Sequence, residues 1–215
     1  KVVTGFTNTD VVLTGTAGAT TAVVTGSGTT YNVEVSGMTV TGTVIATIPA
    51  GGAQDTSGNG NTASTSTDNT VTYDITAPTV TINQAAAQVD PTSASPINFT
   101  VVFSKAVTGF TGADVRLTGT AGATTAVVTG SGTTYNVAVS GMAGSGTVIA
   151  SITAGVATDT AGNGNAASTS TDNTVTYDVT APIVTIDQAA AQADPTNVSP
   201  INFTVVFSKP VTGFI

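Results

Sequence analysis

The side chains of this sequence that could do chemistry are almost all aspartates. The chain has 12 acidic residues and four basic ones, and it contains no histidine and no cysteine. Ten of the aspartates form pairs that lie 104 residues apart: Asp10/Asp114, Asp55/Asp159, Asp68/Asp172, Asp74/Asp178 and Asp90/Asp194. Carboxylates at fixed positions indicate either a cation site built from oxygen ligands or paired acid–base catalysis of the kind used by glycoside hydrolases.

The rest of the composition excludes several classes of function. Without histidine or cysteine there can be no zinc or haem site on those ligands, no disulfide scaffold and no nucleophilic triad. Four cations, at Lys1, Lys105, Arg116 and Lys209, are too few to neutralise a nucleic-acid backbone. Aromatic residues are only 5 % of the chain, which leaves few platforms for a sugar substrate. We therefore expect no enzymatic activity.

The sequence repeats with a period of 104 residues. Lys1–Phe6 recurs at Lys105–Phe110 and at Lys209–Phe214, and residues 1–77 match residues 105–181 at 62 of 77 positions without a gap. Residues 78–111 match residues 182–215 at 27 of 34 positions. Boundaries at Pro78 and Pro182 divide the chain into a partial repeat without its first strands (1–77), a complete repeat (78–181) and the first strands of another (182–215).

Composition and alternation predict an all-β fold. The chain is rich in threonine and valine, which favour strands, and in turn-forming residues, whereas leucine, glutamate and lysine are scarce. Period-two alternation in the complete repeat predicts about seven strands. Their inward residues are Val80, Ile82, Ile97, Phe99, Val101, Phe103, Val115, Leu117, Tyr135, Val137, Val139, Val148, Ala150, Ile152, Val175 and Tyr177, with a further strand at 125–128. Seven short strands in about 100 residues favour a two-sheet sandwich of immunoglobulin type.

Several motifs resemble the bacterial immunoglobulin-like repeats of large surface adhesins and extracellular fibres. They are Thr76–Ile82, the strand Ile97–Lys105 with Val107–Phe110 and Asp114, Ser131–Tyr135, and Ala157–Asn163. The resemblance covers the whole chain. It implies tandem β-sandwiches in an extracellular stalk at the bacterial cell surface, often with calcium at the junctions, and no catalysis.

Strand order predicts where the aspartates meet. In a seven-strand sandwich, the loops that hold Asp114 and Asp159 lie at the end where the chain enters through Asp74. Oxygen ligands in loops suit Ca²⁺, which takes six to eight of them, and Asn163 could complete the shell. The equivalent residues Asp10 and Asp55, and Asp90 with Asp178 at the opposite end, would serve neighbouring junctions. The alternative is that these aspartates cap turns by binding their own backbone.

Two functions follow as hypotheses. The first is a structural spacer in an extracellular stalk, adhesin or filament, with calcium at its junctions. The second is an immunoglobulin-like module that binds a carbohydrate or a receptor through its loops, although these loops lack the Tyr, Trp and Arg of typical recognition surfaces.

The expected partners are neighbouring copies of the repeat, head-to-tail. The partial repeats at the two ends have two explanations: the chain is a window onto a longer array, or residues 182–215 of one chain complete residues 1–77 of the next by strand complementation. Sequons at Asn98, Asn197 and Asn202 could also carry glycans.

Overall fold

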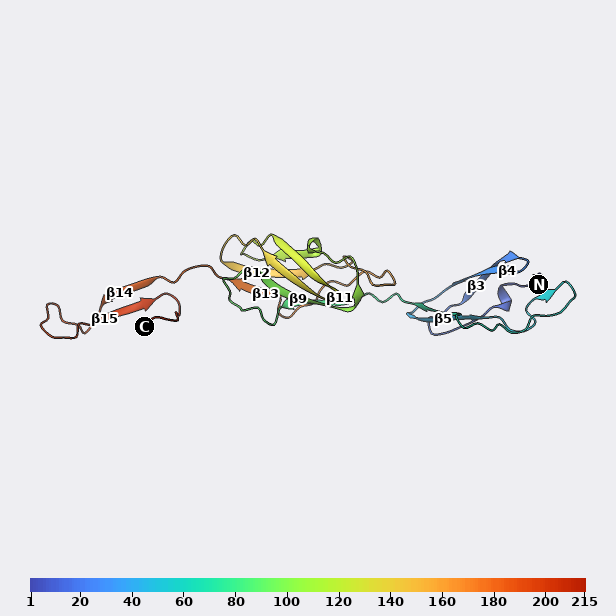
Figure 1. The fold of residues 1–215 in the computed structure, drawn as a ribbon, viewed down its shortest axis with the longest axis horizontal. Coiled ribbons are helices and arrows are strands. Elements are labelled where there is room, and N and C mark those ends of the chain that lie inside the picture. Colours follow the sequence, from blue (N-terminus) through green and yellow to red (C-terminus); the bar gives the residue numbers. More distant parts are fainter.

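The molecule is a row of three parts along one axis. The computed structural model describes residues 1–215, and Figure 1 shows an N-terminal part, a central part and a C-terminal hairpin that follow one another with single linkers between them. The N-terminal part and the C-terminal hairpin therefore lie at opposite ends of the molecule. The linkers at residues 74–79 and 178–183 join the three parts along this axis.

The central part contains two antiparallel sheets. One has the strand order β11-β9-β8 and the other the order β10-β12-β13. The elements are β8 (Val80–Gln84), β9 (Ile97–Val107), the 3₁₀ turn η2 (Gly112–Asp114), β10 (Val115–Thr118), β11 (Thr125–Ser140), β12 (Gly146–Ile152) and β13 (Thr174–Tyr177). No helix in the structure has the length and apolar character needed to cross a membrane.

The long strand β11 is a hairpin that folds back on itself. The Thr124 N–H donates to the Ser140 carbonyl at 3.2 Å, so the two ends of β11 lie side by side. Gly130, with φ +114°, stands at the bend, where a Cβ atom would lie 2.6 Å from the Thr134 carbonyl oxygen. The two halves of β11 are the two strands predicted for this stretch. The sheets then have the strand order of a constant-type immunoglobulin sandwich, which confirms the predicted fold.

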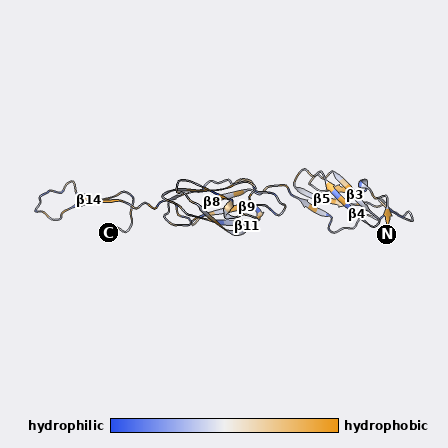
Figure 2. Ribbon diagram, turned by 90° about the horizontal axis from the view of Figure 1, so that it is seen from above, coloured by the Kyte–Doolittle hydropathy of each residue, from blue (hydrophilic) through white to orange (hydrophobic).

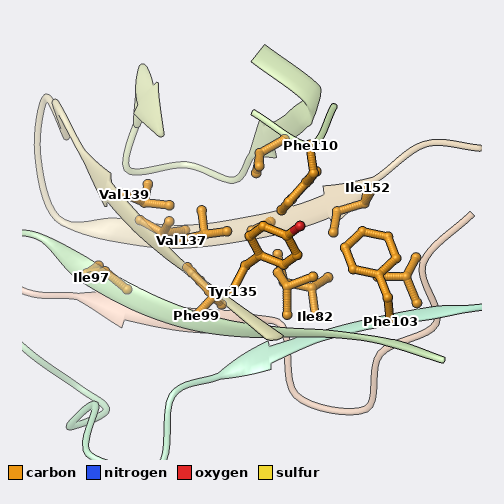
Figure 3. Close-up of a cluster of buried hydrophobic side chains, with 14 of the residues drawn as sticks. Ile82, Ile97, Phe99, Phe103, Phe110, Tyr135, Val137, Val139 and Ile152 are labelled. Atoms are coloured by element: carbon orange, nitrogen blue, oxygen red, sulfur yellow. The ribbon is translucent and has the colours of Figure 1, made fainter. Parts of the chain in front are cut away.

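The core lies between these two sheets. Of the residues predicted to point inward, all are buried except Leu117 and Tyr177, which are half-buried. Figure 3 shows Phe103 of one sheet beside Ile152 of the other, with Tyr135 and Ile82 next to them. The Tyr135 hydroxyl donates to the Val107 carbonyl at 3.0 Å, so this buried tyrosine keeps a hydrogen-bond partner. A cluster of 18 buried residues lies wholly within residues 80–175.

The N-terminal part repeats the arrangement of the central part from Lys105 onward, without the equivalents of β8 and of most of β9. Its elements are β1 (Val3–Thr4), η1 (Asn8–Asp10), β2 (Val12–Thr14), β3 (Thr21–Ser27), β4 (Thr30–Ser36), β5 (Gly42–Thr47), β6 (Gln54–Asp55) and β7 (Thr70–Tyr73). Val12 pairs with Thr47 in the sheet β2-β5-β7, as Arg116 pairs with Ser151 in the sheet β10-β12-β13. No strand pairs with the outer edge of β4, because the sheet that contains it has only β3 and β4.

The C-terminal hairpin repeats the first two strands of the central part. β14 (Val184–Gln188) pairs with β15 (Phe203–Phe207) and with no other strand. Val184 faces Phe207 in this hairpin, as Val80 faces Phe103 in the central part. Figure 2 shows hydrophobic residues along β14 and along β3 and β5, in the two parts of the molecule that lack a closed core.

Candidate functional site at the junction

A lysine stands where the first linker meets the central part. Lys105 lies near the end of β9, and its ammonium is bound by three oxygens: Asp74 Oδ2 at 2.6 Å, the Thr76 carbonyl at 2.6 Å and Asp159 Oδ2 at 2.9 Å. An ammonium has three N–H donors and no acceptor, so all of its hydrogen-bonding capacity is used. Two of the oxygens belong to the linker and the third to the loop between β12 and β13. One cation thus joins the linker to the central part.

The Asp159 loop is held in place by its own backbone. Asp159 Oδ1 accepts hydrogen bonds from the N–H groups of Ala161 (3.0 Å) and Asn163 (2.9 Å), which closes a tight turn. Gly162 takes φ +89° in this turn, a conformation that glycine adopts at little cost. The Asn163 side chain donates to the Asp74 carbonyl at 3.0 Å, so the loop also touches the linker directly.

A buried asparagine supports the same loop from below. Asn165 is buried, and its Oδ1 accepts the N–H groups of Val156 and Ala157, each at 2.9 Å. Its Nδ2 donates to the carbonyls of Thr153 and Ala166. All of its side-chain donors and acceptors are satisfied, so it fixes the path of the chain that presents Asp159.

The linker is also tied to the N-terminal part. Asp74 Oδ1 accepts from the Thr76 N–H at 2.9 Å and from the Thr41 hydroxyl at 3.3 Å. The Ile75 N–H donates to the Thr41 hydroxyl at 3.0 Å. Asp74 therefore contacts the N-terminal part through one carboxylate oxygen and the central part, through Lys105, with the other.

The charges in this junction stabilise one another. The hydrogen bond to Asp74, followed by that to Asp159, raises the pKa of Lys105 above its ordinary value of 10.5. The hydrogen bond from Lys105 lowers the pKa of Asp74. Burial favours the neutral form of Asp159, but its hydrogen bonds from Lys105 and Asn163 outweigh this and hold its pKa well below the usual range. All three groups are charged at neutral pH.

Each of the other two copies of this lysine makes a part of the same contact: Lys209 binds the linker, and Lys1 binds the loop aspartate. Lys209 binds Asp178 Oδ2 and the Thr180 carbonyl, and its hydrogen bond lowers the pKa of Asp178 to about 2. Lys1 binds Asp55 Oδ2 at 2.7 Å. We define the lysine junction as Lys105 with Asp74, Thr76 and Asp159.

The remaining predicted metal ligands lie elsewhere or bind other partners. Asp114 Oδ2 accepts from the N–H and the hydroxyl of Thr111, at 2.7 and 2.8 Å, and Asp10 does the same with Thr7. Asp90 accepts from the Thr176 N–H at 2.9 Å. The Asp178 N–H donates to the Thr92 carbonyl, so Asp90 and Asp178 lie on neighbouring backbone segments as expected.

The expectation that Asp114 joins Asp74 and Asp159 is wrong. Asp114 closes the 3₁₀ turn η2 by capping it, which is the alternative role foreseen for single aspartates. The structure contains no group of three His, Cys, Asp or Glu side chains that could hold a metal ion. Asn163 points its amide donor, not an oxygen, at the carboxylate of Asp159. Calcium binding as such stays a prediction.

Sequence reasoning overlooked Lys105 as the partner of the aspartates. A signal was present, because lysine recurs at 1, 105 and 209 with the same 104-residue spacing as the aspartate pairs. A cation that repeats in step with the carboxylates indicates an ion pair within the protein.

The comparisons with known proteins identify the central part. Residues 74–177 match the family model of a bacterial Ig-like domain, so this segment is a domain of that family, as predicted. The match includes Asp74, Lys105 and Asp159. No curated protein and no solved structure matches the chain significantly.

Proposed function

We propose that this chain, whose residues 74–177 form a bacterial Ig-like domain, belongs to a stiff spacer on the outside of a bacterial cell. Domains of this family are non-catalytic modules that typically occur in surface or extracellular proteins. The repeats are nearly identical, which suits a protein in which the number of copies determines length better than one in which each repeat carries a different binding site. The row of parts along one axis supports the same function.

The observation that carries the proposal is the lysine junction. A linker without partners would let neighbouring parts swing freely, as flexible linkers do. Here Asp74 and Thr76 of the linker bind Lys105, and the Asn163 amide binds the Asp74 carbonyl. These contacts restrict the linker to one path into the central part. A spacer whose junctions are restricted in this way stays extended, so its length grows with the number of domains.

Calcium is the alternative means of holding the same junction. It would have to bind Asp74 and Asp159 through the oxygens that now accept from Lys105, so Lys105 would have to move away. The contacts of Lys105 favour the ammonium as the cation of this site.

The test is small-angle X-ray scattering of the chain, at a concentration where it is monomeric, against its Lys105→Gln variant. We expect the variant to have a smaller maximum dimension and a broader distribution of shapes, because the linker loses its cation. Arg116→Gln is the matched control, since it removes the same charge from an exposed residue of β10 that makes no ion pair. Identical scattering from the chain and the Lys105→Gln variant would refute the proposal.

A further inference from the structure

The loop between β12 and β13 contains an asparagine followed by a glycine, a pair of residues that can react with each other. Asn163 precedes Gly164 in this loop. Asparagine is one of the thermolabile residues, because the backbone nitrogen of the next residue can attack its side-chain amide carbon and expel ammonia. Glycine permits this attack most readily, since it has no Cβ atom to hinder the approach and its backbone is the least restricted. The pair lies beside the lysine junction, so its chemistry affects the linker.

The attacking nitrogen of this pair is free of other partners. Gly164 lies opposite Thr158 in an isolated antiparallel bridge. The hydrogen bonds of this bridge are made by the residues on either side of Gly164: the Asn163 carbonyl accepts one at 3.1 Å, and the Asn165 N–H donates the other at 2.9 Å. The N–H of Gly164 itself makes no hydrogen bond within the protein. Asn163 and Gly164 are both half-buried, so water can also reach them.

Packing requires the glycine at this position. A Cβ atom on Gly164 would lie 3.0 Å from the Gly155 Cα atom, so any larger residue would force the neighbouring loop to shift. Asn163 is needed as well, because its side chain is the direct contact between this loop and the linker. The two residues therefore have separate structural roles, and together they form the reactive pair.

The amide of Asn163 is held by hydrogen bonds that the reaction must break. Its Nδ2 donates to the Asp74 carbonyl at 3.0 Å and to the two carboxylate oxygens of Asp159 at 3.2 and 3.3 Å. Expelling Nδ2 as ammonia removes all three of these contacts. The intact junction therefore opposes the reaction, and the reaction in turn removes contacts from the junction.

We propose that Asn163 is a modification site at which deamidation loosens the junction. The Gly164 nitrogen forms a bond to Asn163 Cγ, the bond from Cγ to Nδ2 breaks, and ammonia leaves with the proton of the Gly164 N–H. Water then opens the resulting five-membered imide and leaves a carboxylate at position 163, as aspartate or as its β-linked isomer. The reaction consumes water alone and needs no oxidant or reductant. This inference rests on the proposed function, because it concerns the same junction.

The new carboxylate would change an attraction into a repulsion. An amide nitrogen donates hydrogen bonds, whereas an ionised carboxylate only accepts them. At position 163 this group would face the Asp159 carboxylate, which now lies 3.2 Å from the amide nitrogen, and repel it. The Asp74 carbonyl would lose its donor at the same time. The loop would then hold the linker only through Lys105, a single cation near three carboxylates.

Peptide mapping by mass spectrometry tests whether the folded protein reacts. After prolonged incubation of the folded chain in mildly alkaline buffer, we expect Asn163 to be converted to aspartate and its isomer. Asn98, which precedes phenylalanine, should keep its amide. The same chain in urea is the positive control, and conversion should be faster there because unfolding removes the hydrogen bonds that oppose it. An Asn163 that keeps its amide in the folded chain would overturn the proposal, whether or not it reacts in urea.

Small-angle X-ray scattering of the Asn163→Asp variant measures the consequence, because aspartate is one product of the reaction. In buffer without divalent cations, we expect a smaller maximum dimension and a broader distribution of shapes than in the parent chain. Asn59→Asp is the matched control, since it adds the same charge to the equivalent loop of the N-terminal part, where Asn59 binds Asp55. If Asn163→Asp scatters like the parent while Lys105→Gln does not, the spacer function stands and this inference is wrong. If neither variant differs from the parent, both are wrong.

Discussion

Lys105 satisfies three acceptors from two parts of the chain, and this geometry depends on an ammonium. Its three N–H donors point along the directions of a tetrahedron and can reach the carboxylates of Asp74 and Asp159 as well as the Thr76 carbonyl. A planar guanidinium presents its donors in a flat fork, so arginine is a poor substitute here. Asp159, whose side chain is only 3 % exposed, would be left as a buried charge if Lys105 were removed.

The pKa shifts define the pH range in which the junction holds. The pKa values of Asp74 and Asp159 are lowered from 3.8, so their contribution to stability is present above about pH 4 and is lost as pH falls through the lowered values. The pKa of Lys105 is raised from 10.5, so its contribution is present below that value and is lost only as pH rises through the raised pKa.

We therefore predict that the melting temperatures of the chain and of its Lys105→Gln variant differ by a constant amount from about pH 5 to about pH 9. The difference in melting temperature should disappear in acid well below pH 4, where the carboxylates of the folded protein become protonated. Differential scanning calorimetry of both proteins across this range measures it. A difference that changes between pH 6 and pH 8 would contradict the assignment, because none of the three groups titrates there.

At the scale of elements, identical sequences lie in different surroundings. Asn98–Phe103 of β9 and Asn202–Phe207 at β15 have the same six residues, but Phe99 is buried in the closed core and Phe203 is exposed in a hairpin. Burial, and not local sequence, determines what each phenylalanine contributes to stability. Phe203, the exposed equivalent, is therefore a matched control for a substitution of the buried Phe99.

Phe99→Ala should lower the free energy of unfolding of the central part by about 3–5 kcal/mol, the usual cost of a buried phenylalanine-to-alanine change. Phe203→Ala should leave the unfolding of the central part unchanged in dilute solution, because Phe203 is not part of that core. Urea denaturation monitored by hydrogen exchange in β12 reports on this part alone. A comparable loss from both substitutions would show that the hairpin and the central part unfold as one unit.

The sequence predicted the strands of the central part well but placed Asp114 in the wrong group of side chains. Alternation located the inward faces of β9 and β12, because a strand with one buried face must repeat with a period of two. It could not show that Thr111 would cap Asp114, since that depends on the 3₁₀ turn η2. Nor could spacing alone show that Lys105 would lie between Asp74 and Asp159. Tertiary structure determines which side chains contact one another, and the strand pattern does not predict those contacts.

At the scale of the whole molecule, the identity of the junction cation determines how the spacer responds to its surroundings. A lysine is carried by the chain itself, so its junction works at any calcium concentration. Lys105 is 30 % exposed, so salt should screen its ion pairs in part and loosen the junction gradually. A calcium-held junction would instead change sharply as the ion is removed, because two carboxylates would then repel each other.

We predict that neither calcium nor a chelator changes the scattering dimensions of the parent chain, measured at a concentration where it is monomeric. In Lys105→Gln, by contrast, Asp74 and Asp159 lose their shared cation, and millimolar calcium should restore part of the lost extension by bridging the two carboxylates, since hard oxygens are the ligands it prefers. Magnesium is the matched control, because it demands a strict octahedral geometry and gives up its waters reluctantly. If the chelator alone bends the parent chain, calcium and not Lys105 holds the junction. If calcium leaves Lys105→Gln bent, the two carboxylates are set for the lysine ammonium and for no other cation.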